Sequence, residues 1–211
     1  MKNLKIIITT FLIGVTVTMN GQSNPDKRIK EAALNGKADL IKILSTNKDF
    51  NFGVSPRDAE ASQPASPIEE FTTDFKSLLN DNVRDIFSIS RPNEKFIVPL
   101  TTNNKVITTI SIASNSKSTK VVEFINQQFT TELNELSPEI KRKGFEGVKI
   151  VRVPNIDAIL YIYGDKSFTS YNGKNIKEPL NTSDIIRELQ VDARKFQAEF
   201  GDQLKKGKLV K

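Results

Sequence analysis

The sequence predicts an α+β protein built on an antiparallel sheet, and three observations support this fold class. Apolar and polar residues alternate over residues 96–113, and the same period of two returns over residues 148–171. Apolar residues recur at helical spacing over residues 66–86, 125–144 and 181–200. The expected order is therefore helix, two or three strands, helix, three strands, helix, and a small helical hairpin precedes it.

The composition excludes several classes of chemistry. The chain has 211 residues, of which 37% are hydrophobic and 27% charged, as in ordinary soluble globular proteins. It contains no histidine and no cysteine, so Ser-His-Asp triads, imidazole metal sites, thiolate catalysis and disulfides cannot be built. It also has neither a glycine-rich phosphate loop nor a Walker pattern. We therefore expect neither a metal nor a cofactor.

Residues 1–21 have the pattern of a secretory signal peptide. Lys2 and Lys5 precede an apolar run over residues 6–17, and small or polar residues follow it. An uncleaved membrane anchor is the alternative, but the run is short for a bilayer span and threonines interrupt it. We expect cleavage after Gly21, no integral membrane segment in the mature chain, and a periplasmic or secreted protein.

Residues 22–45 are expected to form the helical hairpin. Gly36 can end the first helix, and residues 38–44 make a second one. Residues 31–44 look similar to the helical part of one ankyrin repeat, but no second copy follows, so we interpret the segment as a plain hairpin. Residues 46–65 lack periodicity and contain Asn, Ser, Pro and Gly, so they are expected to be a linker.

The α+β domain is expected to span residues 66–205, and a basic tail follows at residues 206–211. The domain begins with a helix signal, because Ser66 can cap, Pro67 suits the first turn and Glu69 completes a capping box. The apolar residues that follow would form the buried stripe of this helix: Phe71, Phe75, Leu78, Leu79, Val83 and Ile86.

The first half of the sheet is expected to be a hairpin whose loop length decides which residues share a face. A two-residue turn at Asn103 and Asn104 sets Leu100 opposite Ile107, and Asn tolerates the positive φ of such a turn. A three-residue loop sets Leu100 opposite Val106 instead. We prefer the three-residue loop because it gathers most apolar residues on one face: Phe96, Val98, Leu100, Val106, Ile110 and Ile112.

The second half of the sheet is expected to contain three strands, over residues 148–153, 158–163 and 167–171. Their pairing would set Val153 opposite Ala158 and Tyr163 opposite Ser167. One face then carries core residues: Val151, Val153, Leu160, Ile162 and Phe168. The other face carries Ile150, Arg152, Ile159, Tyr161, Tyr163 and Tyr171. Every tyrosine of the chain therefore lies on one face, beside one arginine.

The helix between the two sheet halves is expected to break at Pro138, where Ser137 caps a second short helix that Gly144 closes. Residues 181–200 give the final helix. This order of elements resembles that of profilin-like or roadblock-like folds, and cystatin-like sheets are the alternative. The resemblance concerns topology and implies no activity.

Three polar motifs have ordinary explanations. Residues 114–117 match Ser-x-x-Lys, a nucleophile motif of some hydrolases, but they lie in an expected turn without the companion motifs. Glu132, Glu135 and Glu139 recur at helical spacing beside an apolar stripe, which is typical of a solvated face. Basic residues cluster at 141–143 and near the C-terminus. The C-terminal run lacks the aromatic side chains that nucleic-acid binding needs, and an exported protein rarely meets nucleic acid, so we expect no nucleic-acid partner.

These exclusions favour a small exported binding or interaction protein that is not catalytic. Its expected partner is a protein or another component of the cell envelope, contacted through Arg152, Tyr161, Tyr163 and Tyr171. Tyrosine and arginine suit such a surface because both are common in contact hot spots. A competing interpretation has a helix cover this face, which makes the tyrosines interior residues. The alternative function is a hydrolase-type enzyme that uses carboxylates or lysine, or a periplasmic inhibitor or immunity-type protein.

Overall fold

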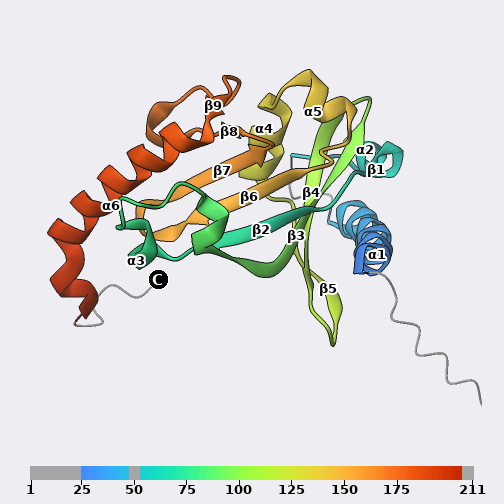
Figure 1. Ribbon diagram of the computed structural model, residues 1–211. Helices are drawn as coiled ribbons and strands as arrows, with labels where there is room; N and C mark the ends of the chain where they lie inside the picture. Colours follow the sequence, from blue (N-terminus) through green and yellow to red (C-terminus); the bar gives the residue numbers. More distant parts are fainter. Residues whose placement is uncertain (1–24, 48–52, 206–211) are drawn as a thin grey trace, which may run out of the picture.

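The computed structural model describes residues 25–47 and 53–205, and all the strands in these ranges form one continuous sheet (Figure 1). The strand order is β5-β4-β3-β2-β6-β7-β8-β9, and β1 pairs with one end of β3. Paired strands are antiparallel except β2 and β6, which are parallel. The expected α+β class is confirmed. The strand bounds are β1 Gln63–Pro64, β2 Ile68–Thr73, β3 Ser90–Thr102, β4 Lys105–Ser114, β5 Thr119–Phe124, β6 Val148–Val153, β7 Ala158–Tyr163, β8 Lys166–Phe168 and β9 Leu180–Asn181.

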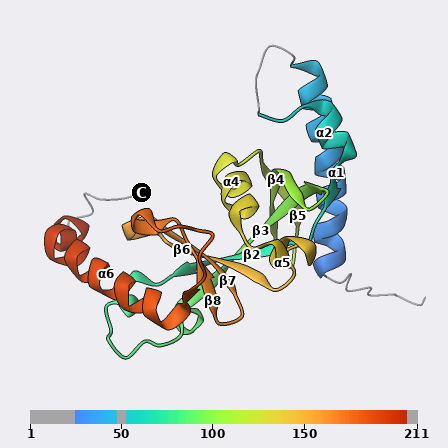
Figure 2. The same cartoon turned by 90° about the horizontal axis from the view of Figure 1, so that it is seen from above.

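Helices cover both faces of the sheet in a three-layer arrangement (Figures 1 and 2). α4 and α5 pack on one face, called the α4 face below, whereas α1 and α6 pack on the opposite face, over different strands. None of the helices in the described ranges is long and apolar enough to cross a membrane. The bounds are α1 Pro25–Thr46, α2 Pro56–Ala61, α3 Phe75–Leu78, α4 Gln127–Glu135, α5 Pro138–Arg142 and α6 Thr182–Lys205, with 3-10 segments η1 Ile86–Ile89, η2 Pro154–Ile156 and η3 Tyr171–Gly173.

α1 is one continuous helix, which corrects the expected hairpin. Gly36 lies inside α1 and does not end it. A Cβ atom at this position would lie 2.7 Å from Val121 Cγ2 on β5, so glycine allows α1 to approach the sheet closely. The expected linker after α1 contains α2 and β1. The apolar side of α1 packs on β4 and β5. It includes Ile29, Ala33, Leu40 and Leu44, which belong to one cluster with residues of β3.

The segment after Ser66 is a strand, which corrects the helix expected over residues 66–86. β2 pairs with β3 on one side and with β6 on the other, so it lies at the centre of the sheet. Burial is highest at alternate residues at its start, Ile68 and Glu70, as in a strand. Pairing on both sides satisfies the backbone of β2 and overrides the local capping signal. Helical structure in this region is limited to η1 and to α3, which Asp74 caps.

The β3–β4 hairpin has the two-residue turn rather than the three-residue loop that we preferred. Asn103 and Asn104 form this turn, and both have positive φ. A β-bulge then places Leu100 opposite Thr108, a pairing that neither expected loop gives. Val106 lies opposite Thr101 and therefore packs on the α4 face. The other apolar residues of the expected face do lie together in the cluster under α1: Phe96, Val98, Leu100, Ile110 and Ile112.

The pairing expected between β6 and β7 is confirmed, and Leu160 and Ile162 are buried together on the face opposite to α4. The pairing between β7 and β8 is shifted by one residue. Tyr163 pairs with Lys166, because the turn between the two strands contains only two residues. Phe168 consequently packs on the α4 face and not beside Leu160.

The later helices follow the sequence. Ser137 caps α5 and Pro138 takes its first turn, and α6 covers the range expected for the final helix. The parallel pairing of β2 with β6 joins the two expected sheet halves, and the profilin-like, roadblock-like or cystatin-like order is not confirmed. The expected signal peptide at residues 1–21 and the basic tail at residues 206–211 lie outside the described residues.

Candidate functional site

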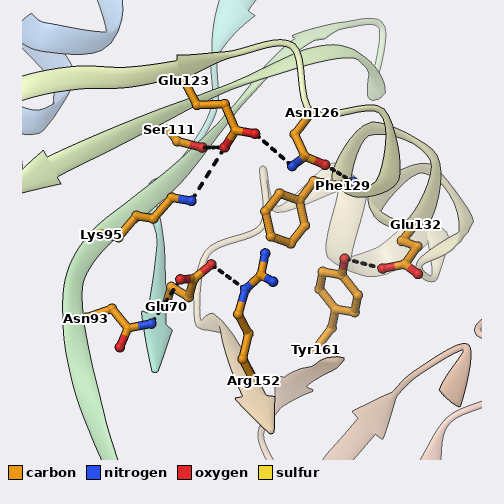
Figure 3. A network of polar contacts seen from close by, with 10 residues as sticks. All are labelled: Glu70, Asn93, Lys95, Ser111, Glu123, Asn126, Phe129, Glu132, Arg152 and Tyr161. Atoms are coloured by element: carbon orange, nitrogen blue, oxygen red, sulfur yellow. Dashed lines mark hydrogen bonds and ion pairs between the residues drawn. The ribbon is translucent and has the colours of Figure 1, made fainter. Parts of the chain in front are cut away.

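The structure separates the four residues of the expected contact surface. Tyr161 on β7 is fully buried beneath α4, and Tyr163 is half-buried against the same cluster. Tyr171 lies in η3 and packs against the core on the opposite face, so the tyrosines do not form one exposed face. Arg152 and Tyr161 remain together, in the polar cluster of Figure 3.

Tyr161 joins the sheet to α4 through a buried carboxylate. Its hydroxyl donates to Glu132 of α4 across 2.5 Å (Figure 3), and Glu132 also accepts from Ser170 at 2.7 Å and Gln128 at 3.3 Å. Glu132 is only 8% exposed, which corrects the solvated face expected for it. Burial, followed by the charge and hydrogen bond of Glu132, raises the pKa of Tyr161 well above its usual value.

Arg152 of β6 is held by two partners on the α4 face. Its Nε donates to Glu70 Oε2 across 2.9 Å, and its guanidinium carbon lies 5.2 Å from the centre of the Phe129 ring. The side chain of Glu70 is only 5% exposed, and Asn93 donates to its other oxygen across 2.9 Å. A buried carboxylate on one side and an aromatic ring on the other restrict the rotation of Arg152.

The outer edge of the Arg152 guanidinium is free. The side chain is 33% exposed, and no described residue accepts a hydrogen bond from its two Nη atoms. These atoms therefore offer donors to solvent in a fixed plane, beside the first turn of α4 (Figure 3). A planar pair of N–H donors matches the two oxygens of a carboxylate or phosphate.

A second polar chain lies on the β3 side of this turn (Figure 3). Glu123 of β5 accepts three hydrogen bonds, at 3.5, 2.8 and 3.1 Å, from Lys95, Ser111 and Asn126. Burial raises the pKa of Glu123, but these hydrogen bonds and the charge of Lys95 together outweigh burial and lower it. Asn126 also accepts from the Phe129 N–H and thereby caps α4.

Tyr163 and Tyr171 each bond to one charged side chain elsewhere. Lys143 Nζ donates to the Tyr163 hydroxyl across 2.8 Å, and the Tyr171 hydroxyl donates to Asp192 of α6 across 2.9 Å. Burial, and then Asp192, raises the pKa of Tyr171 to about 12. Both tyrosines therefore tie neighbouring segments together.

The buried carboxylates of the cluster already accept hydrogen bonds from other side chains of the protein. Glu70 and Glu132 have both oxygens hydrogen-bonded within the protein, whereas a general acid or base needs access to a substrate proton. The ranges that the structure describes also contain no group of three or more side chains suited to holding a metal ion. What the cluster can offer a ligand is the edge of Arg152, with the Lys95 ammonium nearby.

Sequence reasoning found Arg152 but not the residues that hold it. Glu70 is an acidic residue at a buried position of strand β2. The prediction of a helix over residues 66–86 did not indicate that this side chain would be buried. The bulge after Glu70, which brings Asn93 to its carboxylate, has no signature in the sequence.

A fold of this kind does not specify a function. No protein-family model, curated protein or solved structure matches this chain.

Proposed function

We propose that this chain is an exported, non-catalytic interaction protein that contacts its partner through the Arg152 surface. The observation that supports this best is the free Nη edge of Arg152, which Glu70 and Phe129 hold in place. The partner is a protein or another component of the cell envelope that presents an acidic group. We define the Arg152 surface by four side chains around the first turn of α4: Asn93, Lys95, Glu123 and Arg152.

An arginine that is fixed before binding loses less conformational entropy when the partner arrives. Immobilising a flexible side chain at an interface costs about 0.5–1.5 kcal/mol. Glu70 and Phe129 have already restricted Arg152, so this cost is reduced. Arginine is also enriched among the residues that dominate binding energy at interfaces. Arg152 is therefore the best candidate for the anchoring contact.

The charges around Arg152 favour a single acidic group over a polyanion. Arg152 and Lys95 are positive, but Glu70 and Glu123 lie beside them and neutralise the local field. Binding to nucleic acid depends on a net positive surface that displaces counterions, so it is not part of this proposal. A carboxylate suits the site, because the two Nη atoms can donate to both of its oxygens.

A hydrolase-type function receives less support from the geometry. Ser114 of the Ser-x-x-Lys match hydrogen-bonds to Thr119 across the β4–β5 hairpin, and no described residue bonds to Lys117 Nζ. The carboxylates Glu70 and Glu132 are engaged internally. An inhibitor or immunity-type protein is a special case of the interaction function, because it too acts through a contact surface.

Export is supported by residues 1–21, where two lysines precede an apolar run. N-terminal sequencing of protein isolated from the cell envelope tests this part of the proposal. The expected mature chain begins near Gln22. An intact Met1 in a membrane pellet would contradict it.

Site-specific photo-cross-linking in cells that export the protein tests the contact surface. A photoreactive residue replaces Lys95, which belongs to the same polar cluster as Arg152 (Figure 3), or Lys195 on α6, which serves as the matched control. Position 95 is expected to give one discrete product that position 195 does not give. The same product from both positions, or no product from position 95, would contradict the proposal.

A further inference from the structure

A groove of about 640 Å³ lies between α1 and the hairpin formed by β4 and β5, which are neighbours in Figure 1. Its volume is in the range of small-molecule binding sites, about 300–1,000 Å³. α1 packs on the sheet face opposite to α4, whereas Arg152 lies on the α4 face. The groove, called the α1 groove below, is therefore separate from the Arg152 surface.

Three cationic side chains line the α1 groove: Arg28 on α1, and Lys117 and Lys120 on the hairpin. Within the described part of the chain, none of these three side chains has an ion-pair or hydrogen-bond partner. Two acidic residues, Glu31 and Asp39, also line the groove. Asp39 is about 16 Å from Arg28 along the helix axis, and the Glu31 carboxylate lies 3.9 Å from Lys27 Nζ.

Arg28 is the unusual member of this set. The residue is half-buried, and its Nε is buried with no acceptor among the described residues. Burying a guanidinium donor without an acceptor is unfavourable, and buried arginines are normally paired. The Nη atoms of Arg28 are not buried, so an anion in the groove can reach the same guanidinium. The groove thus contains an arginine that has no ion-pair partner within the part of the chain that the structure describes.

Apolar residues line the α1 groove beside the cations. Ala32 and Gly36 contribute from α1, and Val121 and Phe124 contribute from β5. Gly36 presents no side chain towards Val121, where a Cβ atom would lie 2.7 Å from Val121 Cγ2. The combination of cations without ion-pair partners among the described residues and nearby apolar side chains matches a ligand that has an anionic head and an apolar body.

We propose that the α1 groove binds a small organic anion. The head group, a carboxylate or a phosphate, lies between Arg28 and the lysines of the hairpin, Lys117 and Lys120. The apolar part of the ligand lies on Val121 and Phe124. This site does not depend on the function proposed for the Arg152 surface, because the two sites share no residue and lie on different faces of the sheet.

Titration of the isotope-labelled protein with defined probes tests the proposal by NMR. Octanoate and octyl phosphate carry both parts of the ligand, with different head groups. 1-Octanol carries only the apolar part, and inorganic phosphate only the charge. We expect one or both amphiphilic anions to shift the amide signals of residues 28–36 and 117–124 in a saturable way, and more strongly than octanol or inorganic phosphate. The stronger of the two anions identifies the preferred head group.

Charge-removing variants locate the head group. Arg28→Gln is expected to weaken binding of the preferred anion by about tenfold, the effect of losing a charge-assisted hydrogen bond. Lys30→Gln is the matched control, because Lys30 is exposed on the same helix and does not line the groove, and it should leave affinity unchanged. Lys120→Gln provides a second test at an exposed position whose change does not threaten folding.

Three results would overturn the proposal. The first is the absence of saturable binding by either amphiphilic anion. The second is equal weakening by Arg28→Gln and Lys30→Gln, which would indicate attraction to the net charge alone. The third is octanol binding as tightly as octanoate, which would show that the cations take no part. None of these results bears on the Arg152 surface, which the cross-linking experiment tests separately.

Discussion

At the scale of single residues, the buried carboxylates of Glu70 and Glu132 determine which side chains meet on the α4 face. Glu132 is buried because Tyr161, 29 residues further along the chain, donates to it under α4. Its spacing with Glu135 and Glu139 is also the spacing of a solvated helix face, so periodicity alone could not distinguish the two outcomes. The exposure of Arg152 likewise depends on Glu70, which the chain brings to it from 82 residues away.

Tyr161→Phe is expected to destabilise the protein by about 1–3 kcal/mol, because Glu132 stays buried and loses a donor. The ring remains, so its packing against Phe129 is kept. Urea denaturation measures the change. Tyr163→Phe is the matched control, since its half-exposed hydroxyl meets only an exposed lysine, and it should change the free energy of unfolding by less than about 0.5 kcal/mol. Equal effects of the two variants would contradict the buried contact.

Alkaline titration tests the tyrosine environments. The folded-state pKa of Tyr171 is raised to about 12 from an ordinary value of 10.0, and that of Tyr161 is raised well above its ordinary value. A raised pKa stabilises the fold fully below the unfolded value, and this stability is lost as the pH rises through the folded value. Stability should therefore fall from pH 10 towards pH 12. Tyrosinate absorbance should show that Tyr161 ionises only on unfolding, whereas ionisation of Tyr161 and Tyr171 near pH 10 in the folded state would contradict the structure.

At the scale of elements, two local sequence signals mark structures other than the ones they predict. Gly36 marks a close approach of α1 to β5 rather than a helix end. The Ser66-Pro67 signal precedes the central strand β2, because pairing with β3 and β6 outweighs a helix cap. The sequence predicted the strands with strong alternation of apolar and polar residues: β3, β4, β6 and β7. This alternation does not indicate the bulge in the β3–β4 hairpin.

Gly36→Ala distinguishes the two roles of this glycine. In a solvated helix interior the change stabilises by about 1 kcal/mol. Here the new Cβ would lie 2.7 Å from Val121 Cγ2, so we expect destabilisation of about 1–2 kcal/mol from overpacking. Thermal unfolding gives the sign. Adding Val121→Ala should recover part of the loss, whereas a stabilised single variant would show that α1 does not press against β5.

At the scale of the whole molecule, the sequence predicted the α+β class but not how the sheet is joined. Alternation identifies strands and helical spacing identifies helices, whereas the parallel pairing of β2 with β6 depends on contacts between distant segments. That pairing also builds the candidate site, since it sets Glu70 and Arg152 on the same face of adjacent strands. Arg152 could therefore be chosen from the sequence, but its support and the burial of Tyr161 could not.

Arg152 can be removed without leaving a buried charge if Glu70 is neutralised with it. Arg152→Gln alone should destabilise by about 2–4 kcal/mol, less than for a fully buried pair because water reaches the guanidinium. The double variant Glu70→Gln/Arg152→Gln leaves no unpaired buried charge, so its stability should stay within about 1 kcal/mol of the wild type.

The role of the Arg152 surface in partner binding is tested most directly by cross-linking from position 95 in the Glu70→Gln/Arg152→Gln variant. The free energy of unfolding of the same variant is measured in parallel. If the Arg152 surface is the contact site, the yield of the discrete product should fall about tenfold, as expected for loss of a bidentate charged contact, while the protein remains folded. A folded double variant that gives the wild-type yield would contradict a contact through the Arg152 surface, because Arg152 and Glu70 would then only stabilise the fold.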